Sequence, residues 1–291
     1  MARSGVHLTF RQARILILLG VLVATVAWAA ETEQRHRARS RWVRPVEVGV
    51  VLLARDGAVD VRHWRRGLDA LASRLEAEMR RWHGPGLPPF RFELVGPVGW
   101  KGRFPLSPPS DRMTDRAWHA LDLWRVLRDV DGAAGLDRTG WDVRVYVLTE
   151  QTPGWSGSFA EGSGTLNGEL ALVRSSAGGD LSMPLQVIGH ELLHTVGASD
   201  KYDDGGHARD PEGVAEPELS PRYPQRHAEW MVGEVPLSPG VGRLPSSLDE
   251  VRVGPLTARE IGWARPVQAA EADAPQQRLR SPGELSAVLR R

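Results

Sequence analysis

The chain has 291 residues, enough for one sizeable domain or two small ones. Its 37 basic and 36 acidic residues leave a net charge of +1, so composition gives no indication of nucleic-acid binding and no nucleic acid is expected as a partner. No cysteine is present, which excludes disulfides, thiolate zinc ligands and a cysteine nucleophile.

The N-terminus has the layout of an export segment. Three arginines, the last of them Arg14, precede an apolar run over residues 15–30. The triplet Ala27-Trp28-Ala29 fits a small-x-small cleavage site, and its tryptophan equally suits an interfacial anchor. Residues 1–30 are therefore predicted to be a signal peptide or a membrane anchor, with attachment through residues 15–30 in the second case. In both cases the remainder is exported, to the periplasm, the extracellular space or the outer side of a membrane.

A single globular domain is predicted over residues 45–267. Residues 31–44, rich in arginine, are predicted to be a solvated basic linker, with membrane or polyanion binding as the alternative. Residues 268–291 are predicted to be a mobile tail.

Strand and helix patterns alternate through the first part of this domain. In residues 46–53, apolar residues first alternate with other residues and then follow one another without interruption. This pattern predicts a strand that is buried on both faces at one end. Apolar residues at every third or fourth position predict a helix over residues 61–82. Two more strands are predicted over residues 90–95 and 143–148, and a third over residues 169–173.

A second amphipathic helix is predicted over residues 111–130. Its inward face is expected to carry four large apolar side chains, those of Trp118, Leu121, Trp124 and Leu127.

The most informative stretch is His190-Glu191-Leu192-Leu193-His194. Two histidines four residues apart lie on one face of a helix, so both imidazoles reach one metal ion. Glu191 then lies beside the ion, where a general base takes a proton from water. The alternative is an amphipathic helix with two surface histidines, but the apolar neighbours would leave unpaired imidazoles in a costly, partly buried setting.

A third ligand follows in the next turn. Gly197 readily adopts the left-handed conformation that ends a helix, and the chain then turns back and brings Asp200 to the same ion. The fourth position stays open for water, as in catalytic zinc sites. His207 and His227 are rival ligands, although each needs a longer loop to close on the ion. The predicted cofactor is Zn²⁺, held by the two histidines of the motif and by Asp200.

The spacing His190-Glu191-x-x-His194-x-x-Gly197-x-x-Asp200 resembles the metzincin-type zinc endopeptidases in which aspartate replaces the usual third histidine, as in snapalysin. The string from Gly197 to Asp203 is also similar to the immune-inhibitor-A-like secreted bacterial metalloproteases. Deuterolysin-type enzymes use aspartate too, but with a different tyrosine spacing. The resemblance implies an α/β (α+β) fold, a metzincin-like zincin domain with a mixed twisted sheet and an active-site helix, and the predicted order of elements is similar.

The same resemblance implies two further features. Metzincins carry a methionine in a tight turn beneath the zinc, and Met231, followed by Val232-Gly233, is the candidate; an ordinary core methionine is the alternative. Metzincins also have an edge strand that runs along the cleft and pairs with the substrate backbone. Residues 169–173 resemble that strand, with an exposed flexible hairpin as the alternative.

Two tyrosines are candidates for a transition-state stabiliser. Tyr202 and Tyr223 follow the motif and are two of only three tyrosines in the chain. A phenol hydroxyl donates a hydrogen bond to the oxyanion of the transition state, whereas packing is the alternative role for either side chain.

The motif and the resemblance together predict an exported zinc metalloendopeptidase, a hydrolase of peptide or protein substrates with Glu191 as general base. A zinc hydrolase of a non-peptide amide is an alternative, which would keep the site and lose the strand that pairs with peptides. A non-catalytic exported binding module is another, although a pure binder has no need for Glu191. Nothing in the sequence indicates an oligomeric state.

Overall fold

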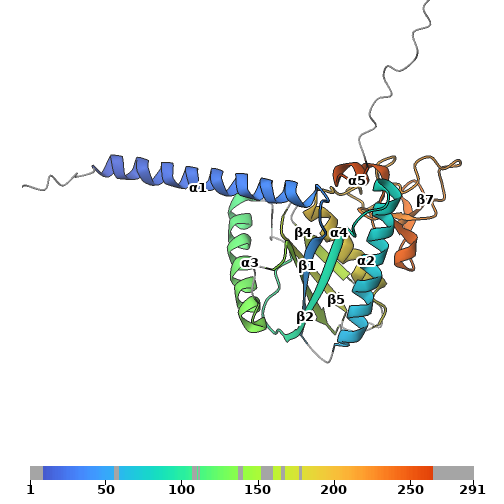
Figure 1. The fold of residues 1–291 in the computed structure, drawn as a ribbon, viewed down its shortest axis with the longest axis horizontal. Coiled ribbons are helices and arrows are strands. Elements are labelled where there is room, and N and C mark those ends of the chain that lie inside the picture. Colours follow the sequence, from blue (N-terminus) through green and yellow to red (C-terminus); the bar gives the residue numbers. More distant parts are fainter. Residues whose placement is uncertain are drawn as a thin grey trace, which may run out of the picture.

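The structure, a computed structural model, describes residues 9–55, 59–106, 110, 112–136, 140–151, 160–164, 168–176 and 179–264. The predicted mobile tail over residues 268–291 lies outside these residues. Figure 1 shows one long helix that projects from a domain built around a central sheet.

The central sheet has five strands in the order β2-β1-β3-β5-β4. The strands are β1 (Val46–Ala54), β2 (Phe90–Gly99), β3 (Val143–Glu150), β4 (Ala160–Gly164) and β5 (Leu170–Ser176). Four of them are parallel, and β4 runs antiparallel to β5 at one edge. The predicted mixed α/β character is confirmed, with a mostly parallel sheet and an apolar helix before it.

Three helices cover the two faces of the sheet: α2 (Val61–His83), α3 (Met113–Ala134) and α4 (Ser182–Thr195). Successive residues of a strand point to opposite faces, so Val50 packs in the core with α2 and α4, whereas Val51 packs in a second core with α3. The predicted helices and strands of this region all form, with boundaries that shift by a few residues.

The edge of the sheet differs from the prediction. Residues 169–173 were expected at the edge, but β5 pairs with β3 on one side and with β4 on the other. The edge strand is therefore β4, which lies beside α4. Its sequence from Ala160 contains two glycines and no large apolar residue, so it lacks the signals by which a strand is recognised.

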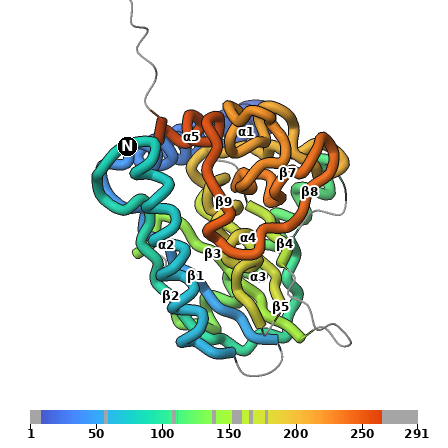
Figure 2. The backbone as a smooth tube through the Cα atoms, turned by 90° about the vertical axis from the view of Figure 1, so that its right-hand side faces the viewer, coloured from blue at the N-terminus to red at the C-terminus, as the bar shows by residue number. Residues whose placement is uncertain are grey.

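The chain beyond α4 forms a second layer over the end of that helix (Figure 2). It contains the short pairs β6 (Ala228–Glu229) with β9 (Val251–Arg252), and β7 (Val235–Ser238) with β8 (Val241–Arg243). The single-turn helix η1 (Leu248–Glu250) precedes β9, and helix α5 (Pro255–Glu260) follows it. Trp230 and Trp263 are fully buried in this layer and fix it to the main core.

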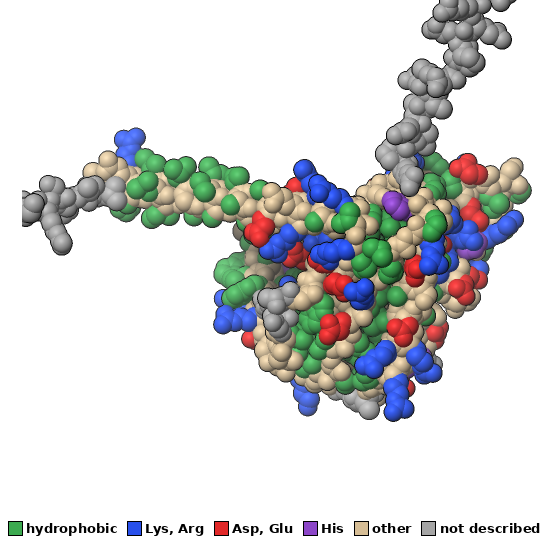
Figure 3. Space-filling view, in the orientation of Figure 1, with side chains coloured by type: hydrophobic (Ala, Val, Ile, Leu, Met, Phe, Trp, Pro, Cys, Tyr) green, Lys and Arg blue, Asp and Glu red, His purple; other side chains and the backbone are tan. Residues whose placement is uncertain are grey.

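Among the described residues, α1 (Phe10–Arg39) is the one helix long and apolar enough to cross a membrane. It projects from the domain and is covered with hydrophobic side chains along most of its length (Figures 1 and 3). The structure differs from the predicted linker over residues 31–44, because α1 continues to Arg39. Glutamates and arginines four residues apart, such as Glu31 with Arg35 (2.6 Å), support this continuation.

The end of α1 is packed onto the domain. Arg39 is buried and donates to the carbonyl oxygens of Gly168 (2.9 Å) and Thr195 (3.5 Å). Trp42 is also buried, and its indole N–H donates to the carbonyl of Ile261 (2.7 Å). The domain therefore begins before residue 45 and holds α1 in a defined direction.

The orientation of α3 in the structure also differs from the predicted one. Leu127 is buried as predicted, but Trp118 and Trp124 face solvent, with 68% and 51% of their surfaces exposed. Large apolar residues occur on two sides of this helix, and Val130 and Leu127 mark the side that packs on the sheet. The predicted inward position of the two tryptophans is wrong.

Candidate metal centre

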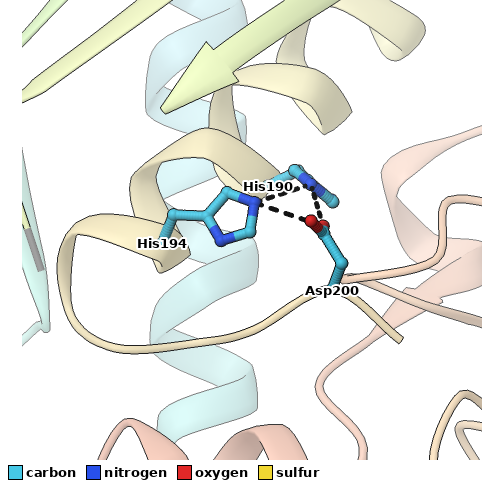
Figure 4. A group of neighbouring side chains, drawn as sticks. All are labelled: His190, His194 and Asp200. Carbon is cyan, nitrogen blue, oxygen red and sulfur yellow. Dashed lines mark hydrogen bonds and ion pairs between the residues drawn. The ribbon is translucent and has the colours of Figure 1, made fainter. Parts of the chain in front are cut away.

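Helix α4 holds both histidines of the motif on one face. Its residues Ile188, Leu192 and Leu193 are fully buried in the main core, which fixes the helix against the sheet. The four-residue spacing sets the two imidazoles side by side, and Nε2 of His190 lies 3.1 Å from Nε2 of His194. Figure 4 shows the two rings directed at a common point.

The turn after α4 brings Asp200 to the same point. Gly197 has a φ of 109°, in the left-handed region that favours glycine, and its N–H donates to the carbonyl of His194 (3.1 Å). Oδ1 of Asp200 then lies 3.1 Å from Nε2 of His190 and 3.2 Å from Nε2 of His194 (Figure 4). The three predicted ligands are thus together, in a group capable of holding a metal ion.

The geometry of this group suits a small cation. Ligand atoms 2.0–2.2 Å from a tetrahedral zinc ion are about 3.3–3.6 Å apart, and the three atoms are separated by 3.1–3.2 Å. Oδ1 of Asp200 is buried, and its neighbours are the Nε2 atoms of His190 and His194. A buried carboxylate oxygen that faces two imidazole lone pairs is costly, and a cation among the three atoms removes that cost.

Local electrostatics also favour positive charge at this point. Burial raises the pKa of Asp200, but the two facing imidazoles outweigh it and hold this pKa well below its usual value. Burial lowers the pKa of His194, yet the Asp200 carboxylate and the Ala198 carbonyl raise it above its usual value. The lowered pKa of Asp200 and the raised pKa of His194 both indicate that a positive charge between the carboxylate and the rings is favourable.

Backbone carbonyls orient the two imidazoles. Nδ1 of His190 lies 3.1 Å from the carbonyl oxygen of Trp230, and Nδ1 of His194 lies 2.7 Å from that of Ala198. A carbonyl oxygen only accepts, so each neutral ring donates from Nδ1 and presents the Nε2 lone pair to the common point. This is the arrangement of histidines that bind metals.

Met231 lies in a tight turn, and the preceding residue of this turn, Trp230, contacts His190. The N–H groups of Val232 and Gly233 both donate to the carbonyl of Glu229 at 3.0 Å, and Met231 is fully buried. Because the carbonyl of Trp230 in the same turn holds His190, the turn supports the metal centre directly. A tight turn thus lies at Met231, and its role as the turn beneath a zinc ion stays a prediction.

Glu191 is buried beside the edge strand, where glycines make room for it. A Cβ atom on Gly162 would lie 2.4 Å from Oε1 of Glu191, and one on Gly164 would lie 2.7 Å from Oε2. Burial raises the pKa of Glu191 above its usual value. The role of the glycines was not predicted, although glycine within a strand often marks a close approach.

We expect Gly162→Ala to lower kcat/KM for peptide hydrolysis by about ten- to a hundredfold, because the new methyl group displaces the Glu191 carboxylate. Zinc content should stay at the wild-type level, since no ligand is touched. Gly132→Ala is the matched control, because a Cβ there meets no atom within 4 Å. Unchanged kinetics in Gly162→Ala would show that Glu191 needs no such space.

A pocket of about 320 Å³ opens beside the three ligands. It is bounded by α4, β4 and the turn at Met231, and its walls include His190, Glu191, Tyr202, Val187, Val232 and Leu244. Tyr202 is half-exposed there, and burial together with the carboxylates of Asp200 and Glu191 raises the pKa of its phenol. Tyr223 is not in this pocket, because its hydroxyl donates to Asp210 (3.0 Å).

Of the two candidate tyrosines, Tyr202 lies in the pocket beside the three ligands and Tyr223 does not. We expect Tyr202→Phe to lower kcat by about tenfold with little change in KM, less than for an enclosed donor because this side chain is half-exposed. Tyr223→Phe serves as the control and should leave both constants unchanged. Equal effects of the two substitutions in steady-state kinetics would remove Tyr202 from the mechanism.

The rival histidines bind carboxylates away from the three ligands. Nδ1 of His207 lies 3.3 Å from Oε1 of Glu234, and Nδ1 of His227 lies 3.1 Å from Oε2 of Glu216. Neither histidine belongs to the group around Asp200.

A buried lysine anchors the loop that carries Asp200. Nζ of Lys201 donates to the carbonyl of Ser199 (2.6 Å) and to Oε2 of Glu260 in α5 (2.7 Å), and only 1% of this residue is exposed. The N–H of Lys201 also donates to the carbonyl of Met231 (3.1 Å). These bonds fix the loop on both sides of Asp200, a role that sequence alone did not indicate.

Compared with models of known protein families and with curated proteins, the sequence matches none. The metal centre is therefore characterised by its own geometry.

Proposed function

We propose that this chain is an exported zinc-dependent endopeptidase, with His190, His194 and Asp200 as zinc ligands and Glu191 as general base. The observation that carries the proposal is the triangle of two Nε2 atoms and one Oδ1 atom with 3.1–3.2 Å sides. Glu191 is adjacent in sequence to the first ligand and has a raised pKa, which supports the catalytic role.

The chain's own groups account for the proton transfers of peptide hydrolysis. Bound zinc supplies Lewis-acid polarisation and makes water acidic enough to ionise near neutral pH. Glu191 takes the proton of the attacking water and delivers it to the amine that leaves. Tyr202 donates a hydrogen bond to the oxyanion that forms on the former carbonyl oxygen.

The edge strand favours a peptide substrate over a non-peptide amide. Among the described residues, β4 pairs with β5 alone, so its other side has backbone groups available for strand addition. The strand β4 lies next to Glu191 and forms part of the wall of the pocket beside the ligands. An extended peptide held there passes the metal centre, whereas a small amide gains nothing from the strand.

A binding module without catalysis is disfavoured by the setting of Glu191. Its carboxylate is buried at the cost of desolvation, and two glycines of β4 accommodate it. A site used for recognition alone has no need of this arrangement.

We further propose that α1 is retained as a membrane anchor, with the catalytic domain outside the cytoplasm. The helix continues without a break through Ala27-Trp28-Ala29, the candidate cleavage triplet. Its last turn packs on the domain through Arg39. A helix that is both apolar and packed on the domain suits an anchor better than a segment that is removed.

The function is tested by incubating the purified full chain with a mixed peptide library and, separately, with a panel of non-peptide amides. We expect cleavage within peptides, suppressed by a chelator and restored by zinc. Hydrolysis of the amides without any peptide cleavage would replace this proposal with the non-peptide alternative. Absence of turnover of both by zinc-loaded protein would favour a binding module.

A further inference from the structure

One face of α3 is apolar, basic and exposed. Six residues share this side of the helix, namely Ala117, Trp118, Leu121, Trp124, Arg125 and Arg128; Leu121 is partly buried and the other five are exposed. The two tryptophans are exposed by 68% and 51% although the helix packs on the sheet with its opposite side. Figure 3 shows hydrophobic side chains gathered over α3 at the edge of the domain beside α1.

Acidic side chains border this face on one flank, where Asp115 and Asp122 line a pocket together with Trp118 and Arg125. Asp115, Asp122 and Asp129 are spaced by seven residues and form a stripe along one flank, where Asp122 pairs with Arg103 (3.3 Å). The face itself carries two arginines, and the guanidinium of Arg128 lies 5.6 Å from the ring centre of Trp124. Tryptophan beside arginine is the composition of helices that lie in the headgroup region of a membrane.

The direction of α1 determines how this face meets a membrane. The domain holds the end of α1 through the buried side chains of Arg39 and Trp42. Figure 1 shows that α3 runs across the direction of α1 and is the element of the domain closest to the projecting, N-terminal part of α1. When α1 crosses a bilayer, α3 therefore lies parallel to the bilayer surface and next to it.

We propose that α3 is a second membrane contact, lying on the surface of the same bilayer that α1 crosses. Trp118, Leu121 and Trp124 enter the boundary between headgroups and acyl chains, and Arg125 and Arg128 bind the phosphates of anionic phospholipids. This proposal rests on the retention of α1 as an anchor. Two attachments fix the tilt of the domain relative to the bilayer, and the metal centre then lies on the side of the sheet that faces away from the membrane.

The absence of cysteine allows an environment-sensitive fluorophore to be placed at a single chosen position. We would label three full-length variants in vesicles of phosphatidylcholine and phosphatidylglycerol. Ala117→Cys reports on the exposed face of α3, Ala77→Cys on an exposed site of α2 across the sheet, and Leu18→Cys on α1. The Ala117 and Leu18 labels should be quenched by nitroxide-labelled lipid and shielded from iodide, and the Ala77 label should behave in the opposite way.

Substitutions on the face then identify the groups that bind the lipid. In the Ala117→Cys background, Trp118→Ser with Trp124→Ser should abolish quenching by the lipid, and Arg125→Glu with Arg128→Glu should weaken it severalfold. Arg65→Glu with Arg66→Glu, at exposed positions of α2, is the matched charge control and should have no effect. Unchanged circular dichroism of each variant verifies folding.

Three results would overturn the proposal. An Ala117 label open to iodide while the Leu18 label is in lipid would show that α3 stays in water. An Ala117 label shielded from iodide but not quenched by nitroxide-labelled lipid would show that a second copy of the chain, not the bilayer, covers α3. A Leu18 label open to iodide would overturn the anchor and the surface contact together, without bearing on the proposed peptidase activity.

Discussion

Glu191→Gln should lower kcat/KM for peptide hydrolysis at least about a hundredfold while the protein still binds one zinc ion per chain. Glutamine keeps the size of the side chain and fits the space beside Gly162 and Gly164, but it takes up no proton. The loss therefore reflects proton transfer, because the three ligands are unchanged. Steady-state kinetics and metal analysis of the same preparation measure both quantities.

Glu161→Gln is the matched control for this variant. Glu161 lines the same pocket, but it lies on β4 and pairs with Arg174 (3.0 Å) at the surface. We expect its neutralisation to leave kcat within about twofold of wild type, as for a surface ion pair of little energetic value. A Glu191→Gln enzyme that lost its zinc yet kept its activity would contradict the assignment of Glu191 as base.

Asp200→Ala should weaken zinc binding at least about a hundredfold, since removal of a group that only supports a ligand already costs ten- to a hundredfold. It removes one of three protein ligands and leaves the two imidazoles of α4 to hold the ion alone. Competition with a chromophoric chelator measures the change in affinity.

The two rival histidines provide the controls for Asp200→Ala. His207→Ala and His227→Ala should each keep the wild-type affinity, because these rings bind Glu234 and Glu216 rather than the common point. If either histidine variant lost zinc and Asp200→Ala retained it, the third ligand would have been assigned to the wrong residue.

The metal centre was predictable because its information is local in the sequence. Helical spacing puts His190 and His194 on one face, and Gly197 permits the turn that returns Asp200, all within eleven consecutive residues from His190 to Asp200. The helices and strands with clear apolar periodicity were predictable for the same reason, as in β1 and α2.

Features that depend on tertiary contacts were not predictable from the sequence. The edge strand β4 is held by pairing with β5, and the value of Gly162 appears only when Glu191 lies against it. Trp118 and Trp124 share the helical spacing of core residues, so periodicity alone assigns them to the wrong side of α3. Burial of Lys201 depends on Glu260, far along the chain.

The most direct test of the central claim is a zinc titration of the chelator-stripped full chain, with peptide cleavage followed at each addition. Zinc held by His190, His194 and Asp200 beside Glu191 predicts that the rate rises in proportion to added zinc and reaches its plateau at one ion per chain. A chelator-stripped chain that cleaves peptides at its full rate before zinc is added would contradict the account. So would a chain that binds one zinc ion tightly and cleaves no peptide.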